Sequence, residues 1–182
     1  MDQARITHIG GPTALIEVGG WRILTDPTFD PPGRRYFFGW GTTSRKLAGP
    51  SVPAAELGEI DAVLVSHHHH GDNLDASAQA LLPTWGTTFT TKKAAARLGA
   101  HCVGLDAWET ATLEAPGRET ITITATPCRH GPVGSEPITG PVVGFALSWP
   151  GQRNGSLWMT GDTVLYPALR EAAGRLKVGT LL

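Results

Sequence analysis

The chain has 182 residues, of which 41% are hydrophobic and 17% are charged, a composition that is typical of a folded globular domain and excludes a disordered chain. Its 15 lysines and arginines balance 16 aspartates and glutamates, so there is no general basic field to hold nucleic acid or an anionic membrane. The two cysteines are too few for a disulfide framework, and no apolar run is long enough for a signal sequence or a membrane span. We therefore expect a cytoplasmic protein without nucleic-acid or membrane partners.

The first half of the chain is predicted to be mostly β-structure. Short apolar or alternating runs predict strands, and the pair Gly19-Gly20 between two of them is typical of a tight hairpin. A turn-rich segment follows at residues 26–53, and loops of this length are often functional. The predicted strands of this half are residues 5–9, 13–18, 21–25 and 60–65.

The second half of the chain alternates between helices and strands. Segments rich in Ala and Leu predict short helices, whereas residues 120–126 alternate between Thr and apolar side chains, as a strand with one buried face does. Without a repeat or a linker, residues 1–182 are predicted to form one α/β or α+β layered domain. The predicted helices are residues 74–82, 91–98 and 166–174, and the predicted strands are residues 87–90, 101–105, 120–126, 142–149, 156–160 and a run that begins at 178.

Side chains that can bind a metal follow the ends of three predicted strands. Four consecutive histidines at residues 67–70, with Asp72 two residues beyond them, follow the first of these strands. His130 and Asp162 follow the other two, and strand ends at one sheet edge can converge in space. Imidazole and carboxylate without thiolate suit Zn²⁺, Mn²⁺ or Fe²⁺, and an aspartate shared between two cations can hold a dinuclear pair.

A purely structural role is the alternative for each of these residues taken alone. A single histidine such as His130 is more often a loop residue, and Asp162 in a Gly-Asp-Thr turn before a helix fits an N-cap. His8 and His101 have no partners in the sequence and are assigned structural roles. Four adjacent histidines beside an apolar strand would leave nitrogens unsatisfied unless something coordinates them, which favours metal binding.

Five segments of the chain, in a fixed order, carry a family resemblance. They are residues 7–11 (THIGG), 24–27 (LTDP), 65–67 (VSH), 126–131 (TPCRHG) and 156–163 (SLWMTGDT). In this order they resemble the metallo-β-lactamase-fold hydrolases, and most of all their L-ascorbate-6-phosphate-lactonase-like branch. The family signature is His-x-His-x-Asp-His after a strand, then a single His, then an Asp in a Gly-Asp-Thr-like turn, and then a last His. The resemblance covers almost the whole chain and implies an αββα sandwich.

The histidine cluster fits the family signature in either of two registers. With His67 as the first ligand, His67 and His69 form the His-x-His pair, and the aspartate comes one residue late. With His68 as the first ligand, the spacing to Asp72 fits, but Asn73 replaces the last histidine. Branch members with a His-Asp-His-His-Ala-Asp-Asn-Leu-Asp loop favour the first register, in which an aspartate takes the position of His68.

The resemblance therefore implies one or two divalent cations per chain, Zn²⁺ or else Mn²⁺ or Fe²⁺. An asparagine in place of a histidine weakens the second site, because an amide oxygen is a neutral and poorer donor to Zn²⁺. The implied ligands are His67, His69 and His130 for the first cation, Asp162 as a bridging ligand, and His70 or Asp72 for the second cation.

The family's last histidine lies beyond the Gly-Asp-Thr turn, and no histidine follows His130 in this sequence. We therefore expect the second half of the sandwich to be incomplete, without its final ligand and its covering helices. The domain is then either cut short or completed by another chain, in a homo-oligomer or by a separate polypeptide. In that case the alternative to a hydrolase is a non-catalytic metal-binding half-domain that needs a partner chain.

The implied reaction is hydrolysis of a small ester, lactone or phosphoester substrate by a metal-activated water. Asp72 is predicted to orient this water or to accept its proton. Tyr166 is predicted either to donate to the leaving group or simply to pack. Loop placement alone suggests supporting roles: Asp26 and Asp75 as acceptors for the ligating histidines, and Arg34, Arg35 and Arg129 either as contacts for an anionic substrate or as solvated surface charges.

Overall fold

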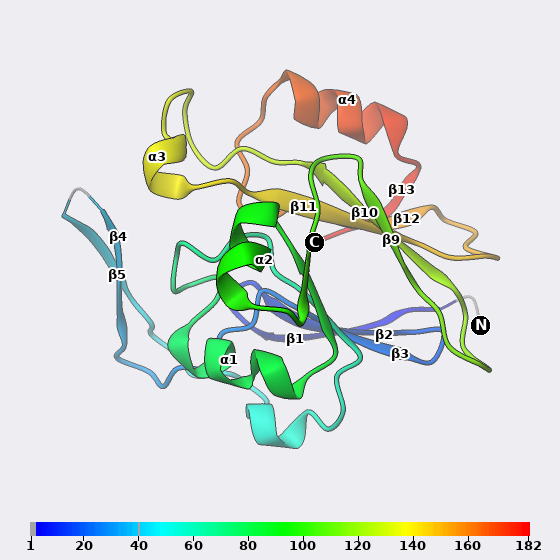
Figure 1. Cartoon of the computed structure of the whole chain (residues 1–182), viewed down its shortest axis with the longest axis horizontal. Helices are drawn as coiled ribbons and strands as arrows, with labels where there is room; N and C mark the ends of the chain where they lie inside the picture. The colour runs from blue at the N-terminus through cyan, green and yellow to red at the C-terminus, as the bar shows by residue number, and fades with distance from the viewer. Residues whose placement is uncertain (1–2, 40) are drawn as a thin grey trace.

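Two β-sheets face each other across the middle of the molecule (Figure 1). The computed structural model describes residues 3–39 and 41–182. The first sheet has the strand order β1-β2-β3-β6-β7-β8, and the second has the order β13-β12-β11-β10-β9. The strands of the first sheet are β1 (Arg5–Gly10), β2 (Thr13–Val18), β3 (Trp21–Thr25), β6 (Ala62–Leu64), β7 (Thr87–Thr90) and β8 (Cys102–Gly104). Those of the second are β9 (Thr110–Leu113), β10 (Ile121–Pro127), β11 (Val143–Ser148), β12 (Ser156–Met159) and β13 (Val178–Leu181).

Apolar residues that are neighbours in the strands of the first sheet enter two different cores. Ile16 and Ile23 are fully buried between the two sheets, where they pack with Phe145 and other residues of the second sheet. Leu15, which precedes Ile16, and Leu24, which follows Ile23, belong to a separate cluster on the outer face of the first sheet. Successive side chains of a strand point to opposite faces, so a continuous apolar run is the pattern of a sheet that is covered on both sides.

Helices cover the outer faces of both sheets (Figure 1). On the first sheet they are α1 (Ala76–Leu81) and α2 (Lys92–Leu98), accompanied by the short 3₁₀ helices η1 (Ala54–Glu56) and η2 (Leu82–Thr84). On the second sheet Ala172 of α4 (Pro167–Arg175) packs against Ala146 and Trp158. The resulting layers confirm the predicted αββα sandwich, although the sequence led us to expect no covering helix on the second sheet.

Three of the strands were not predicted from the sequence. A hairpin of β4 (Arg35–Gly39) and β5 (Thr42–Arg45) lies within the segment expected to be a loop, and it projects from the sandwich near α3 (Glu136–Thr139) (Figure 1). Strand β9 pairs with β10 at the edge of the second sheet. All three elements are short and largely exposed, so local hydrophobic periodicity carries little signal for them.

Four strands end at the same edge of the sandwich. Strands β3 and β6 run parallel in the first sheet, and β10 and β12 share a direction in the second because each is antiparallel to β11. The backbone N–H of Val143 donates to the carbonyl of Ser66 at 3.1 Å and joins the two sheets at this edge. Residues that follow these four strands therefore meet, although they are far apart in the sequence. Among the described residues, no helix is long and apolar enough to cross a membrane.

Candidate metal centre

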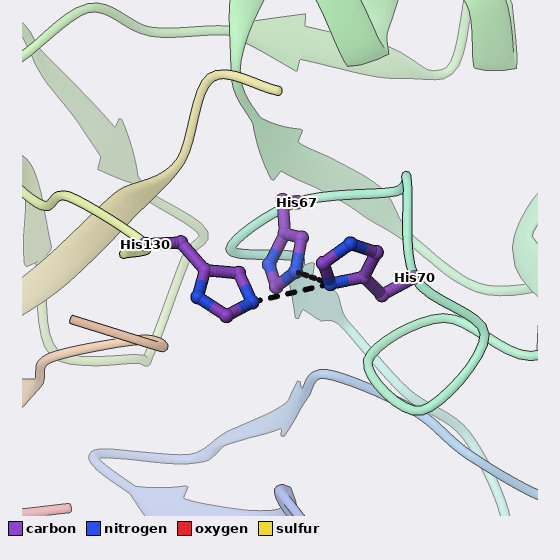
Figure 2. A group of neighbouring side chains, drawn as sticks. All are labelled: His67, His70 and His130. Carbon is purple, nitrogen blue, oxygen red and sulfur yellow. Dashed lines mark hydrogen bonds between the residues drawn. The ribbon is translucent and has the colours of Figure 1, made fainter. Parts of the chain in front are cut away.

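Three imidazole rings meet at this edge of the sandwich (Figure 2). His67 follows β6 of the first sheet, His130 follows β10 of the second, and His70 lies on the loop between β6 and α1. Nδ1 of His70 is 3.4 Å from Nε2 of His67 and 3.2 Å from Nε2 of His130. Zinc–nitrogen bonds of 2.0–2.1 Å in tetrahedral geometry place ligand nitrogens about 3.3–3.4 Å apart. These two separations match that spacing, and the ligand atoms of all three rings lie within 4.8 Å of one another.

The protonation state of His67 and His70 also fits a divalent cation. Burial, with the neighbouring histidines, lowers the pKa of His67 to about 3. Burial likewise lowers the pKa of His70, and His130 adds to this effect. Neutral imidazoles carry the lone pairs that a metal needs, and a shared cation would satisfy nitrogens that face one another. The donor set therefore fits Zn²⁺ or a similar ion.

A buried carboxylate orients His67 through the neighbouring serine. Asp26, which follows β3 and is 1% exposed, accepts the backbone N–H of Ser66 at 2.6 Å and its hydroxyl at 2.8 Å. Because the serine has only one hydroxyl hydrogen, its oxygen accepts from Nδ1–H of His67 at 3.0 Å. This leaves the lone pair on Nε2, the nitrogen that faces the other two rings.

The charge on Asp26 is costly at its buried position. Burial raises the pKa of Asp26 to about 7, against the lowering effect of the two hydrogen bonds from Ser66. The amide nitrogen of Asn73 also donates to this carboxylate, at 3.5 Å. Asn73 thus lies in the network that supports the histidines.

Two further carboxylates lie beside the histidine cluster. Oδ2 of Asp162 is 3.7 Å from Nε2 of His130. Burial raises the pKa of Asp72, and its Oδ1 is buried without a hydrogen-bond partner among the described residues. Both side chains line two cavities, of about 460 and about 340 Å³. The centre therefore opens onto space for a substrate.

His68 and His69 turn away from this group. Their rings lie against each other with centroids 4.1 Å apart, and a β-carbon at Gly140 would overlap the ring of His69. The cluster therefore contains His70 and not His69, whereas the favoured register placed His69 in the first metal site. A turn positions His70, because the N–H groups of Asn73 and Leu74 both donate to its carbonyl. The spacing of residues in the sequence does not predict such a turn.

The remaining predicted site residues lie away from the cluster. The ring of Tyr166 packs beneath the guanidinium of Arg129 and, with Cys128, lines a separate cavity of about 450 Å³. Asp75 caps α1 by accepting from the N–H of Ala78, and so holds this helix and not a histidine. Arg34 is paired with Asp30 at 3.4 Å, and neither Arg34 nor Arg35 is among the residues that line the two cavities.

The four-layer sandwich and its histidine-rich edge are those of a metallo-β-lactamase-type domain. The family model described as "Beta-lactamase superfamily domain" matches residues 21–179, and the chain belongs to this family. Uncharacterized proteins of Mycobacterium bovis and Mycobacterium tuberculosis are 37% identical over 70 residues. This alignment covers 38% of the chain and 18% of the length of those relatives.

Solved structures with the same fold are similar over nearly the whole chain. An isothiocyanate hydrolase from Delia radicum gut bacteria has a TM-score of 0.76 and 20% identity, covering 97% of this chain and 69% of that one. A possible metal-dependent hydrolase from Veillonella parvula has a TM-score of 0.77 and 20% identity, covering 100% and 71%. The metallo hydrolase Igni18 from Ignicoccus hospitalis has a TM-score of 0.65 and 20% identity, covering 92% and 64%.

Proposed function

We propose that this protein is a metal-dependent hydrolase of a small ester, lactone or phosphoester. The observation that carries the proposal is the convergence of the His67, His70 and His130 nitrogens beside two cavities that also contain Asp72 and Asp162. Membership of the β-lactamase superfamily, with three structural relatives named as hydrolases, supports the same reaction class. Imidazole-rich ligation favours Zn²⁺, with Mn²⁺ or Fe²⁺ as the alternatives.

Different residues of the chain would bind the metal and transfer the proton. His67, His70 and His130 would hold a divalent cation, with Asp162 beside His130 as a further ligand. Such a cation supplies a water of lowered pKa and polarises the carbonyl or phosphoryl oxygen of the substrate. Asp72, which lines both cavities, would orient this water or accept its proton. Because Tyr166 lines a different cavity, we assign the proton transfer to Asp72 alone.

Turnover by metal-loaded protein tests this proposal. The substrates are 4-nitrophenyl acetate, a γ-lactone and bis(4-nitrophenyl) phosphate, assayed with the wild type, with His70→Ala and with Asp72→Asn. We expect hydrolysis of at least one substrate, its loss with a chelator, and a loss of roughly 100-fold or more in both variants. Asp106→Asn, at an exposed position outside both cavities, is the matched control. A folded, metal-loaded wild type without turnover of any of the three would instead favour the non-catalytic metal-binding domain.

A further inference from the structure

The two cavities that share Asp72 and Asp162 differ in chemistry. We call the larger one the basic cavity, because Arg45 and Lys46 line it. We call the smaller one the apolar cavity, because Phe38 and Ile138 lie on its wall beside His70 and His130. Asp72 and Asp162 line both cavities. A substrate whose reacting bond lies at the cluster would therefore extend into two unlike environments.

Arg45 carries an uncompensated charge in the basic cavity. It is exposed and has no ion-pair partner among the residues that the structure describes, whereas Lys46 is mostly buried and paired with Asp75. Its cross-strand neighbour on the β4–β5 hairpin is Arg35, which also has no carboxylate partner in the described ranges. Like charges directly opposite each other on paired strands are destabilising, so an anion beside Arg45 would relieve this repulsion.

Tyr36 is a second residue on the wall of the basic cavity. Its ring lines the cavity and packs against Gly71, and the residue is 8% exposed. Its buried hydroxyl has no hydrogen-bond partner in the described part of the chain. Burial and the carboxylates of Asp75, Asp30 and Asp72 raise the pKa of Tyr36, which keeps the hydroxyl protonated. The guanidinium of Arg45 on this wall suits a carboxylate or phosphate oxygen.

The apolar cavity suits the other half of such a substrate. The ring of Phe38 meets the ring of His70 edge-on, with centroids 5.1 Å apart, and Ile138 of α3 lies on the same wall. No lysine or arginine is among the residues that line this cavity. A short alkyl or aryl group would bury its surface there, beside His70 and His130.

Resting on the proposed function, we propose that the substrate is an ester or lactone that carries a carboxylate or phosphate. Arg45 binds this anion in the basic cavity, and an apolar group on the other side of the scissile bond occupies the apolar cavity. Hydrolysis breaks the bond between the carbonyl carbon and the leaving oxygen, adds the hydroxyl of one water to the carbon, and transfers a proton to the leaving group. No further reactant is required.

Binding of uncleaved analogues tests the anion site independently of turnover. The probes are the 4-nitroanilides of pentanoic acid, of glutaric acid with one free carboxylate, and of 4-phosphonobutanoic acid, titrated by calorimetry into metal-loaded protein. We expect the wild type to bind at least one anionic probe roughly 10- to 100-fold more tightly than the neutral one. Arg45→Gln should lose most of this preference, and its thermal unfolding should be recorded beside that of the wild type. Arg34→Gln, with the same charge change at the residue that precedes β4, should retain the preference.

The outcomes separate this inference from the proposed function. Equal binding of all three probes, no binding of any, or an unchanged preference in Arg45→Gln would overturn the anion site. The stronger of the two anionic probes identifies the carboxylate or the phosphate as the group that Arg45 recognises. The 4-nitrophenyl esters of the same acids then report hydrolysis. Anion-selective binding without ester cleavage would refute the hydrolase and leave the anion site in place.

Discussion

Ser66 gives both of its hydrogen-bond donors, the backbone N–H and the hydroxyl, to the buried carboxylate of Asp26. When Asp26 is ionised, the serine oxygen therefore accepts from His67, and this selects the tautomer of His67 whose lone pair faces the other histidines. The loop after β3 thus determines the chemistry of a ring that follows β6. Two predictions follow from this relay, one for metal affinity and one for pH.

Replacement of Ser66 should weaken metal binding without removing a ligand. In Ser66→Ala, Nδ1 of His67 loses its acceptor, and the ring is free to adopt the other tautomer or to rotate. We expect metal affinity to fall roughly 10- to 100-fold, as measured by competition with a chromogenic chelator. Ser148→Ala, at a half-buried position on β11, is the control and should bind metal as the wild type does. Unchanged affinity in Ser66→Ala would argue against the relay.

Asp26 should make the metal-free protein less stable as the pH rises. Its pKa is about 7 in the folded protein against an ordinary value of 3.8, so between these pH values the folded state binds a proton that the unfolded state has lost. The contribution of Asp26 to the free energy of unfolding is therefore full below about pH 4 and is lost as the pH rises through about 7. The whole difference between the two pKa values corresponds to about 4 kcal/mol.

Urea unfolding of the chelated wild type and of Asp26→Asn at pH 5 and pH 8 measures this effect. The asparagine does not titrate, so the difference in unfolding free energy between the two proteins isolates Asp26. We expect the wild type to lose about 2–3 kcal/mol relative to the variant between these two pH values. A difference that stays constant with pH would show that Asp26 is ionised throughout.

His70 and His69 should differ sharply in their importance for metal content. The nitrogen of His70 lies within 3.4 Å of both other cluster histidines, whereas the ring of His69 packs on Gly140. We expect His70→Ala, purified without chelator, to lose most of the metal measured by elemental analysis. His69→Ala should keep it. The reverse result would restore the register in which His67 and His69 form the ligand pair.

A buried hydrogen bond should stabilise the second sheet measurably. The indole N–H of Trp158 on β12 donates to the hydroxyl of Thr126 on β10 at 3.0 Å. Thr126→Val keeps the shape but leaves the indole unpaired, and should cost about 1–3 kcal/mol in the free energy of unfolding. Thr124→Val, on the same strand and half-buried, should change it by less than about 0.5 kcal/mol. Equal effects of the two changes would contradict this role for the bond.

The local pattern of apolar and polar residues was sufficient to predict most strands of the sandwich. The continuous apolar run at residues 60–65 predicted a strand, and the structure places Val63 and Leu64 in the outer and the inner core, respectively. Alternation along residues 120–126 predicted β10, and the ordered motifs predicted the sandwich. The signal is strong here because side-chain direction in a strand depends only on position along the chain.

The sequence by itself also determined which residues could bind a metal, since imidazoles and carboxylates follow the ends of particular strands. Only the tertiary structure decided that His70 and not His69 joins His67 and His130, because a turn after the histidines sets the direction of each ring. It also placed Tyr166 in another cavity. Arg45 lies on a hairpin whose sequence has no regular hydrophobic pattern, and only the tertiary structure brought it to the wall of the basic cavity, which Asp72 also lines. Spacing along a strand is a local property, whereas which side chains converge depends on loop geometry and on the packing of one sheet against the other.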